Sequence, residues 1–339
     1  MGASIREAPI EGYYVETVEG LIFTVKGHVH PPNAIVAFLR YLPSPSGGRA
    51  RGGRRYARIY DFEEQYRVLR EGYPQYVFFD EVLDEEVQGV PLESVAKVYS
   101  PKRRVVEMAS SRDELTPIER DALDFAELLS REAGVPLESI GVSGSILVGL
   151  FTDSSDIDLV VYGRRNCERV HEALRGLREG GRLEGLSVED AVRLHAARGA
   201  GAPLEKYVEQ ERRKVYQGRF RGREFFVRFV KELSEVGERY GDRRYKSLGG
   251  AEVVARVVDA SEAMFTPCTY RVREGRVLRG EEVEVAEVVS FRGQFCDQAS
   301  EGSLIAARGK LEMVVDKSGE VHYRLLLGGR PGDYLVSLD

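Results

Sequence analysis

The segment around residues 143–159 constrains this chain most, because it places two carboxylates inside an apolar strand. Asp156-Ile157-Asp158-Leu159 alternates acidic and apolar residues and continues into Val160-Val161. Side chains two residues apart in a strand point to the same face, roughly 6.6 Å apart at ~3.3 Å per residue. Two like charges that close raise each other's pKa unless a cation lies between them. A divalent cation that prefers oxygen ligands, such as Mg²⁺, is therefore predicted at Asp156 and Asp158.

A glycine-serine turn precedes the acidic strand. Residues 139–143 are predicted to form a short strand, Gly144-Ser145 a tight turn, and residues 146–150 the start of a helix. Glycine lets the backbone approach a phosphate closely. Serine hydroxyls and the first amides of a helix can then donate hydrogen bonds to that phosphate. A phosphate cradle beside paired carboxylates is typical of phosphoryl or nucleotidyl transfer.

Val142-Ser143-Gly144-Ser145, ten intervening residues and Asp156-Ile157-Asp158-Leu159 together resemble the signature of the DNA polymerase beta-like nucleotidyltransferase superfamily. The resemblance covers about residues 115–235, and the whole chain also resembles an archaeal group of predicted nucleotidyltransferases of unknown substrate. It implies that Ser143, Gly144 and Ser145 bind the phosphates of a nucleoside triphosphate. It further implies that Asp156 and Asp158 hold one or two Mg²⁺ or Mn²⁺ ions.

Members of this family usually carry a third carboxylate on a later strand, where it commonly serves as general base for the incoming hydroxyl. The best candidate strand here is Glu224–Val230, and its central position on the relevant face holds Arg228. Glu224 lies four residues earlier on that face and is the candidate third catalytic carboxylate. Asp259 is a further candidate. Arg228 is expected to clamp phosphate instead.

The expected function is metal-dependent transfer of a nucleoside monophosphate from a triphosphate to a hydroxyl acceptor, such as an RNA or DNA end. Two alternatives stay open. Without a third carboxylate, the chain would be a catalytically degenerate nucleotide- or nucleic-acid-binding protein. An acceptor hydroxyl on a small molecule or a protein would call for a deep closed pocket in place of an open basic groove.

Patterning along the chain predicts an α+β protein of three domains. Residues 1–105 form a mixed α/β domain with a β-hairpin at residues 13–25. Residues 106–248 form the nucleotidyltransferase-type α/β domain, in which Thr116-Pro117-Ile118-Glu119 begins a helix with a capping box. Residues 249–339 carry short apolar segments between glycine-rich turns, which predicts a mostly antiparallel β-barrel or sandwich.

Two segments are candidates for contact with RNA or DNA. The run Pro43–Arg55 is rich in Arg, Gly and Pro, which predicts a mobile basic loop at Arg49–Arg55 or, alternatively, the solvated tip of a hairpin. In the C-terminal domain, Phe291–Cys296 combines aromatic and basic side chains that can stack on bases, with burial in a core as the alternative. The charged run Glu209–Lys214 is predicted to be a solvated helix face.

Composition excludes several other classes of protein. A net charge of −6 over 339 residues argues against a general nucleic-acid-coating protein. Cys167, Cys268 and Cys296 are far apart, which argues against a disulfide framework or zinc ribbon and favours a reducing cytoplasm. The chain has no apolar run of ~20 residues, so no membrane span is expected, and Met1–Glu7 lacks the apolar stretch of a signal peptide. Two asparagines, no tryptophan and many charged residues indicate a thermophile.

Overall fold

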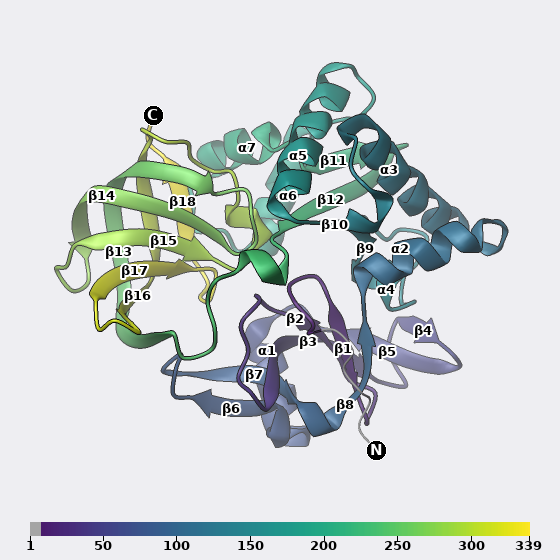
Figure 1. The fold of residues 1–339 in the computed structure, drawn as a ribbon, viewed down its shortest axis with the longest axis horizontal. Coiled ribbons are helices and arrows are strands. Elements are labelled where there is room, and N and C mark those ends of the chain that lie inside the picture. The colour runs from purple at the N-terminus through teal and green to yellow at the C-terminus, as the bar shows by residue number, and fades with distance from the viewer. Residues whose placement is uncertain (1–7) are drawn as a thin grey trace. The chain divides into compact units, whose positions relative to one another are not determined.

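The computed structural model describes residues 8–339 as an α+β protein whose strands form three sheets (Figure 1). The expectation for Met1–Glu7 concerns residues outside this range. Contacts group the chain into two compact units, which are described one at a time. The first unit comprises the described residues up to Asp80, Glu86–Leu183 and Gly218–Tyr240, and the second comprises Glu81–Glu85, Glu184–Gln217 and Gly241–Asp339. The division into domains at residues 105 and 248 stays a prediction.

The first unit begins with an eight-stranded sheet. Its strands are β1 (Tyr14–Thr17), β2 (Ile22–Val25), β3 (Ala34–Pro43), β4 (Arg49–Arg51), β5 (Arg54–Arg58), β6 (Val77–Asp80), β7 (Glu85–Pro91) and β8 (Val95–Tyr99). The strand order is β4-β5-β3-β2-β1-β8, and β7 pairs with both β3 and β6. The predicted hairpin at residues 13–25 is confirmed, because β1 and β2 pair with Glu16 opposite Ile22. Helix α1 (Phe62–Gly72) begins at Asp61, whose carboxylate accepts a 2.8 Å hydrogen bond from the amide of Glu64.

Residues 49–58 form a β-hairpin, so the mobile loop predicted at Arg49–Arg55 is wrong and the alternative of a hairpin is correct. Strands β4 and β5 pair with Arg51 opposite Arg54. Gly52 and Gly53 lie between them at φ values of 55° and 75°. A two-residue hairpin turn of type I′ needs left-handed backbone at both central positions, which glycine adopts without strain. The glycines therefore make a tight turn between regular strands and do not disrupt them.

The second sheet of this unit has four strands in the order β11-β12-β10-β9. They are β9 (Ile140–Val142), β10 (Ile157–Tyr162), β11 (Gln217–Phe220) and β12 (Arg223–Val230). Strand β10 runs antiparallel to β9 and parallel to β12. The helices of this part are α2 (Pro101–Ser110), α3 (Pro117–Ala133), α4 (Gly144–Leu147) and α5 (Arg164–Glu179). Helices α3 and α5 contact each other, and both contact β10.

Local signals in the sequence explain the bounds of α3. The amide of Thr116 donates a 3.0 Å hydrogen bond to the carboxylate of Glu119, as the predicted capping box requires. Gly134 follows the helix at φ +61°, the left-handed conformation of a helix C-cap. The apolar face of α3 buries Phe125 against Phe220 and Phe225, whose ring centroids lie 4.8 and 4.7 Å away.

One apolar core joins the two sheets of the first unit. Tyr13 of the N-terminal part packs in the same buried cluster as Val160 and Tyr162 of β10. A smaller cluster packs Tyr41 of β3 with Leu147, the last residue of α4. Burial of this apolar area contributes about 25 cal/mol per Å² to stability. The N-terminal sheet is therefore fixed against both the glycine-serine bend and the acidic strand.

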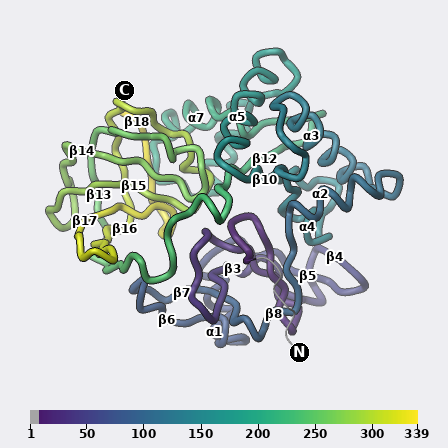
Figure 2. Tube along the Cα trace, in the orientation of Figure 1, coloured from purple at the N-terminus to yellow at the C-terminus, as the bar shows by residue number. Residues whose placement is uncertain are grey.

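The second unit is a curled sheet with two helices, α6 (Val188–Arg198) and α7 (Leu204–Arg213). Its strands are β13 (Arg243–Glu262), β14 (Cys268–Arg279), β15 (Val285–Ser290), β16 (Leu304–Asp316), β17 (Val321–Leu327) and β18 (Tyr334–Ser337). Strand β13 pairs with both β14 and β16, so hydrogen bonds link β13-β14-β15-β17-β16 in a ring, and β18 pairs with β16. The pair β15–β17 is parallel and the others are antiparallel, which agrees with the prediction of a mostly antiparallel sheet. The curl can be followed along the trace in Figure 2.

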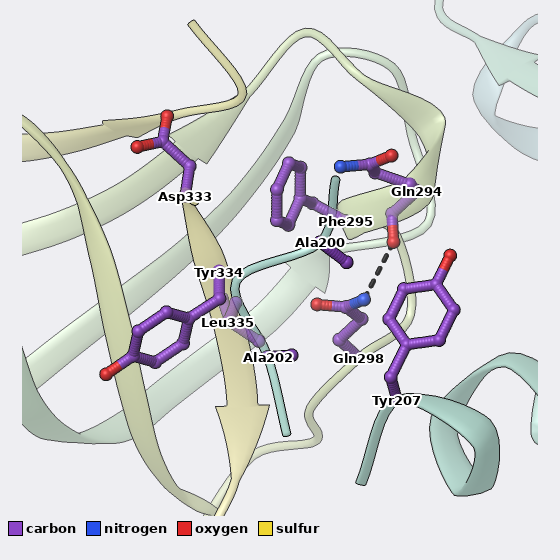
Figure 3. A pocket seen from close by; sticks show the side chains of 9 residues that line it. All are labelled: Ala200, Ala202, Tyr207, Gln294, Phe295, Gln298, Asp333, Tyr334 and Leu335. Carbon is purple, nitrogen blue, oxygen red and sulfur yellow. Dashed lines mark hydrogen bonds between the residues drawn. The ribbon is translucent and has the colours of Figure 1, made fainter. Parts of the chain in front are cut away.

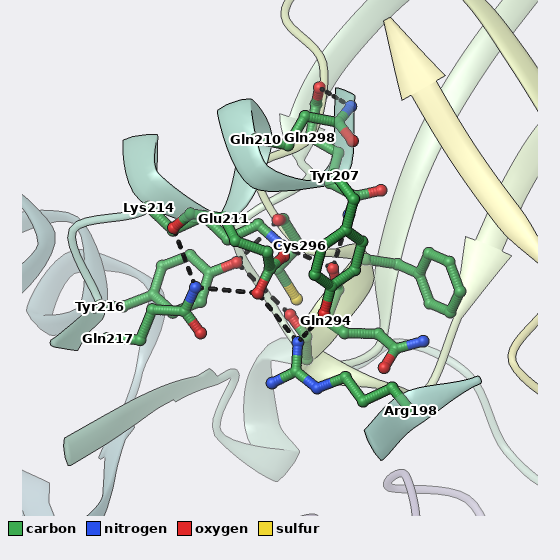
Figure 4. A network of polar contacts seen from close by, with 12 residues as sticks. Arg198, Tyr207, Gln210, Glu211, Lys214, Tyr216, Gln217, Gln294, Cys296 and Gln298 are labelled. Atoms are coloured by element: carbon green, nitrogen blue, oxygen red, sulfur yellow. Dashed lines mark hydrogen bonds and ion pairs between the residues drawn. The ribbon is translucent and has the colours of Figure 1, made fainter. Parts of the chain in front are cut away.

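A buried ionic network ties α7 to the rest of the second unit (Figure 4). The side chain of Glu211 is 0% exposed and contacts Lys214, while its Oε2 lies 2.9 Å from Nη1 of Arg198. Lys214 also donates a 2.6 Å hydrogen bond to the carbonyl of Gln294, which precedes β16. The predicted solvated face at Glu209–Lys214 is thus wrong for Glu211 and Lys214.

Among residues 8–339, no helix combines the length and the apolar character that crossing a membrane requires.

Candidate active site

The glycine-serine bend lies directly against the acidic strand. The amide of Ser143 donates a 2.8 Å hydrogen bond to the carbonyl of Asp158. Gly144 adopts φ +60°, and a Cβ at that position would overlap Oδ2 of Asp158 and lie 2.7 Å from its Cγ. The carboxylate therefore occupies the space that any larger residue at position 144 would need. The structure brings together the two halves of the motif on which the sequence interpretation depends.

Asp158 is half-buried, and both negative and positive side chains act on its carboxylate. Burial raises the pKa of its carboxyl to about 7, with the charge of Asp156 as the second cause, and Arg58, Arg228 and Arg40 act against that rise. A divalent cation bound between Asp156 and Asp158 would offset both the burial and the mutual repulsion.

Ser145 and Ser143 differ in what their hydroxyls contact. Ser145 is 2% exposed, and its Oγ has no hydrogen-bond partner within the described residues. Leaving a buried hydroxyl unpaired costs about 1–3 kcal/mol, which a ligand oxygen would offset. The hydroxyl of Ser143 instead donates a 2.8 Å hydrogen bond to the carbonyl of Gly12. The hydroxyl of Ser145 thus lacks a partner, whereas that of Ser143 fixes the bend to the N-terminal segment.

The register between β10 and β12 determines which residue of β12 lies beside the acidic pair, where a third carboxylate was expected. Asp158 lies beside Phe226, and Arg228 lies beside Val160. Phe226, and not Arg228, is therefore the residue of β12 directly beside Asp158, while the expectation that Arg228 clamps a phosphate stays a prediction. The register of two strands 60–70 residues apart in the chain is set by packing, which no local pattern reveals.

The carboxylates of Glu224 and Asp259 have other partners. Glu224 lies 3.1 Å from Nη2 of Arg219. Asp259 belongs to the second unit, where it lies 3.9 Å from Nε of Arg271. No three acidic, histidine or cysteine side chains of residues 8–339 are grouped to hold a metal ion. A cation at Asp156 and Asp158 would thus take its remaining ligands from substrate phosphates and water, as Mg²⁺ commonly does.

Arg228 is anchored at a buried carboxylate near the pair. Its Nη1 lies 3.1 Å from Oε1 of Glu11, which also lies 3.3 Å from Nζ of Lys26. The amide of Gly27 donates a 2.8 Å hydrogen bond to the other oxygen of Glu11. Arg228 therefore adds positive potential at Asp158 from a fixed position.

Sequence reasoning missed Arg40 of β3 and Arg58 of β5, although both act on the pKa of Asp158. It singled out Arg49–Arg55 instead. In the structure Arg49 donates hydrogen bonds of 2.9 and 3.0 Å to the carbonyl of Leu150 and the hydroxyl of Ser155. Arg51 donates a 3.0 Å hydrogen bond to the carbonyl of Val148 and lies 2.8 Å from Glu16. These two arginines hold the connection between the bend and the acidic strand, so their role is internal.

A cavity of about 10 Å³ in the second unit is lined by Tyr207, Phe295 and Gln298, among others (Figure 3). This volume is about that of one water molecule, so the cavity is too small for a nucleotide or an antibiotic-sized acceptor. Phe295 is 3% exposed, so it belongs to the core, and the stacking role predicted for Phe291–Cys296 does not apply to it.

Asp158→Asn is expected to stabilise the metal-free protein at pH 8 more than at pH 5. The pKa of this carboxyl is about 7 in the folded protein, against an ordinary value of 3.8, so the carboxylate destabilises the fold increasingly as the pH rises from about 4 to about 7. Removing that charge should raise the free energy of unfolding by about 4 kcal/mol at pH 8 and by about 2 kcal/mol at pH 5. Thermal midpoints in EDTA at both pH values measure this. The exposed neighbour Asp153, changed to Asn, is the control, and equal shifts at the two pH values would contradict a raised pKa.

No family model and no solved structure matches this chain. The uncharacterized protein MJ1086 of the archaeon Methanocaldococcus jannaschii is 34% identical to it over 325 residues, which is 93% of this chain and 94% of that protein. The similarity therefore extends over both compact units. The chain belongs to the same family as this uncharacterized archaeal protein.

Proposed function

We propose that this protein is a metal-dependent nucleotidyltransferase of the DNA polymerase beta-like type. It would bind a nucleoside triphosphate with Mg²⁺ or Mn²⁺ and transfer the nucleoside monophosphate to a hydroxyl acceptor. The observation that carries the proposal is the contact between Gly144 and Asp158. A bend shaped for close approach lies against the second acid of an Asp-x-Asp strand, at the spacing that the superfamily signature has.

The residues present fit a divalent cation. Asp156 and Asp158 offer two carboxylates whose repulsion a cation would relieve, and this donor set suits a hard ion. Such an ion, when bound, supplies positive charge to the phosphoryl oxygens. Next to it, the hydroxyl of Ser145 would donate a hydrogen bond to a phosphate oxygen, which would pair an otherwise unpartnered buried atom.

In the proposed reaction, the acceptor oxygen forms a bond to the α-phosphorus while the bond to the bridging oxygen of pyrophosphate breaks. The acceptor hydroxyl loses its proton to water, since neither Glu224 nor Asp259 is grouped with Asp156 and Asp158. The chain's contribution is to orient the triphosphate between the bend and the acidic strand. Orientation and electrostatic stabilisation supply most of the catalysis in phosphoryl transfer.

The register of β12 favours a second candidate function, which is nucleotide binding without turnover. Phe226 lies beside Asp158, and Glu224 is paired with Arg219. A protein with this arrangement would bind a metal-nucleotide complex and release no pyrophosphate. The two functions share the same binding step and differ in whether pyrophosphate appears.

The test compares the wild-type protein with Asp158→Ala. Titration with each nucleoside triphosphate, with and without Mg²⁺, should give Mg²⁺-dependent binding to the wild type, weakened at least about tenfold in the variant. Asp153→Ala is the matched control and should bind as the wild type does. Equal affinity in wild type and Asp158→Ala would overturn the proposed site. The second assay measures transfer from α-labelled triphosphates to RNA and DNA ends and the release of pyrophosphate. Product in this assay identifies an enzyme, whereas binding without product identifies a nucleotide-binding protein.

A further inference from the structure

We propose that Arg40 and Arg58 of the N-terminal sheet form an anion subsite that binds the β- and γ-phosphates of the nucleoside triphosphate. This inference rests on the proposed function and extends it to residues outside the nucleotidyltransferase motif. It assigns a ligand-binding role to the N-terminal sheet, which the superfamily signature does not include.

Geometry places Arg58 beside the glycine-serine bend. Arg58 is the cross-strand partner of Tyr41 in the β3–β5 pair. Tyr41 packs in one buried cluster with Leu147 and Val148, which follow Ser145 by two and three residues. Side chains directly opposite each other on antiparallel strands share a face of the sheet. Arg58 therefore lies on the face of the N-terminal sheet that meets the bend.

Arg40 is held next to Arg58 by the backbone and by an aromatic ring. The amide of Ile59 donates a 3.0 Å hydrogen bond to the carbonyl of Arg40. The guanidinium carbons of Arg40 and Arg58 lie 3.9 and 4.2 Å from the ring centroid of Tyr60, whose side chain is 56% exposed. Because both contact the same ring, the two guanidinium carbons are at most about 8 Å apart. Two like charges at this separation favour an anion with several charged oxygens, such as a polyphosphate.

Neither guanidinium has a hydrogen bond or ion pair to a carboxylate of residues 8–339, unlike Arg51 of β4 and Arg228. Nε of Arg58 is buried and has no hydrogen-bond partner there. An orphaned buried donor on a cation costs more than a neutral one. A phosphate oxygen would satisfy it, and a guanidinium suits phosphate because its planar N–H groups can donate two parallel hydrogen bonds.

The charge of this subsite matches a triphosphate better than it matches a nucleic-acid backbone. Arg40, Arg58 and Arg228 all act electrostatically at Asp158, as Asp156 does with the opposite sign. With a divalent cation present, the site has a net charge of about +3, which suits the roughly fourfold negative charge of a triphosphate. A single-stranded backbone brings only one charge per nucleotide.

The test measures binding of inorganic tripolyphosphate, ATP and AMP at constant ionic strength, in the presence of Mg²⁺. Arg40→Ala and Arg58→Ala are each expected to weaken tripolyphosphate and ATP binding about tenfold, and to leave AMP binding within about twofold of wild type. Arg54→Ala is the matched control, because Arg54 is an exposed arginine next to the turn of the same hairpin. Arg58→Lys, which keeps the charge and loses the paired donors, should fall between wild type and Arg58→Ala.

The possible results test the anion subsite independently of the transfer reaction. Wild-type affinity for tripolyphosphate in the Arg40→Ala, Arg58→Ala double variant overturns the subsite, as does a wild type that does not bind tripolyphosphate. Loss of single-stranded oligonucleotide binding with tripolyphosphate binding intact would assign the cluster to a nucleic-acid backbone and also overturn it. If the variants lose tripolyphosphate binding but no triphosphate is turned over, the subsite stands and the transfer proposal fails. Thermal midpoints within a few degrees of wild type exclude loss of fold as the cause.

Discussion

Glu211→Ala is expected to destabilise the protein by about 3–5 kcal/mol, because the substitution leaves buried Lys214 and half-buried Arg198 without a counter-charge. Glu211 is 0% exposed, contacts Lys214 and lies 2.9 Å from both Nη1 of Arg198 and Nε2 of Gln217. Burial acts to raise the pKa of Glu211, but Lys214 and Arg198 lower it below its usual value, so the carboxylate stays ionised. Urea unfolding at pH 7, followed by circular dichroism, measures the loss.

The matched control is Glu209→Ala, two residues earlier on the same helix. Glu209 is exposed and pairs with Arg213 at the surface. Exposed pairs contribute about 0.2–1 kcal/mol, so this variant should unfold close to the wild-type midpoint. Similar unfolding midpoints for the two variants would show that the network around Glu211 is hydrated and adds little to stability.

The network around Glu211 also explains why the sequence did not predict the buried face of α7. Tyr207, Gln210, Glu211 and Lys214 are the buried positions, at the spacing i, i+3, i+4 and i+7 of one helix face. The periodicity was present in the sequence, but polar residues carry it. A search for apolar stripes therefore classes the helix as solvated. A polar face of this kind becomes recognisable only when its partners, such as the carbonyl of Gln294, are known.

Features with a local cause could be predicted from the sequence. The capping box at Thr116 and Glu119 and the left-handed Gly134 follow from the hydrogen-bonding needs of helix ends. The juxtaposition of Gly144 and Asp158 follows from the motif spacing, since a strand, a turn and a return strand bring these residues together. In each case the deciding residues lie within about 20 positions of one another.

Features that depend on packing between distant segments could not be predicted. Arg58 lies 100 residues before Asp158 in the chain, and only the core shared by the two sheets brings their charges together. The register that sets Phe226 beside Asp158 has the same origin. Alternation along β12 indicates which residues share a face, but the displacement of one strand along its neighbour is decided by side-chain packing.

Gly144→Ala is expected to destabilise the protein by about 2–5 kcal/mol and to abolish Mg²⁺-dependent triphosphate binding by the fraction that stays folded. Left-handed backbone at φ +60° costs about 1–2 kcal/mol for a residue with a Cβ. The new methyl group would also lie 2.7 and 2.9 Å from Cγ and Cβ of Asp158, and such overpacking costs about 1–3 kcal/mol more. Chemical unfolding and nucleotide titration measure the two effects.

A double-mutant cycle separates the contact with Asp158 from the backbone strain. Gly181→Ala is the control for strain alone, because Gly181 adopts φ +70° with nothing within 4 Å of the added Cβ. Combining Gly144→Ala with Asp158→Ala removes the carboxylate that the methyl group would displace, so the destabilisation should be smaller than the sum of the single effects by about 1–3 kcal/mol. Strict additivity would mean that the bend moves away from the acidic strand at little cost. The close fit between them would then have no part in holding a triphosphate, because a bend free to move could not orient one.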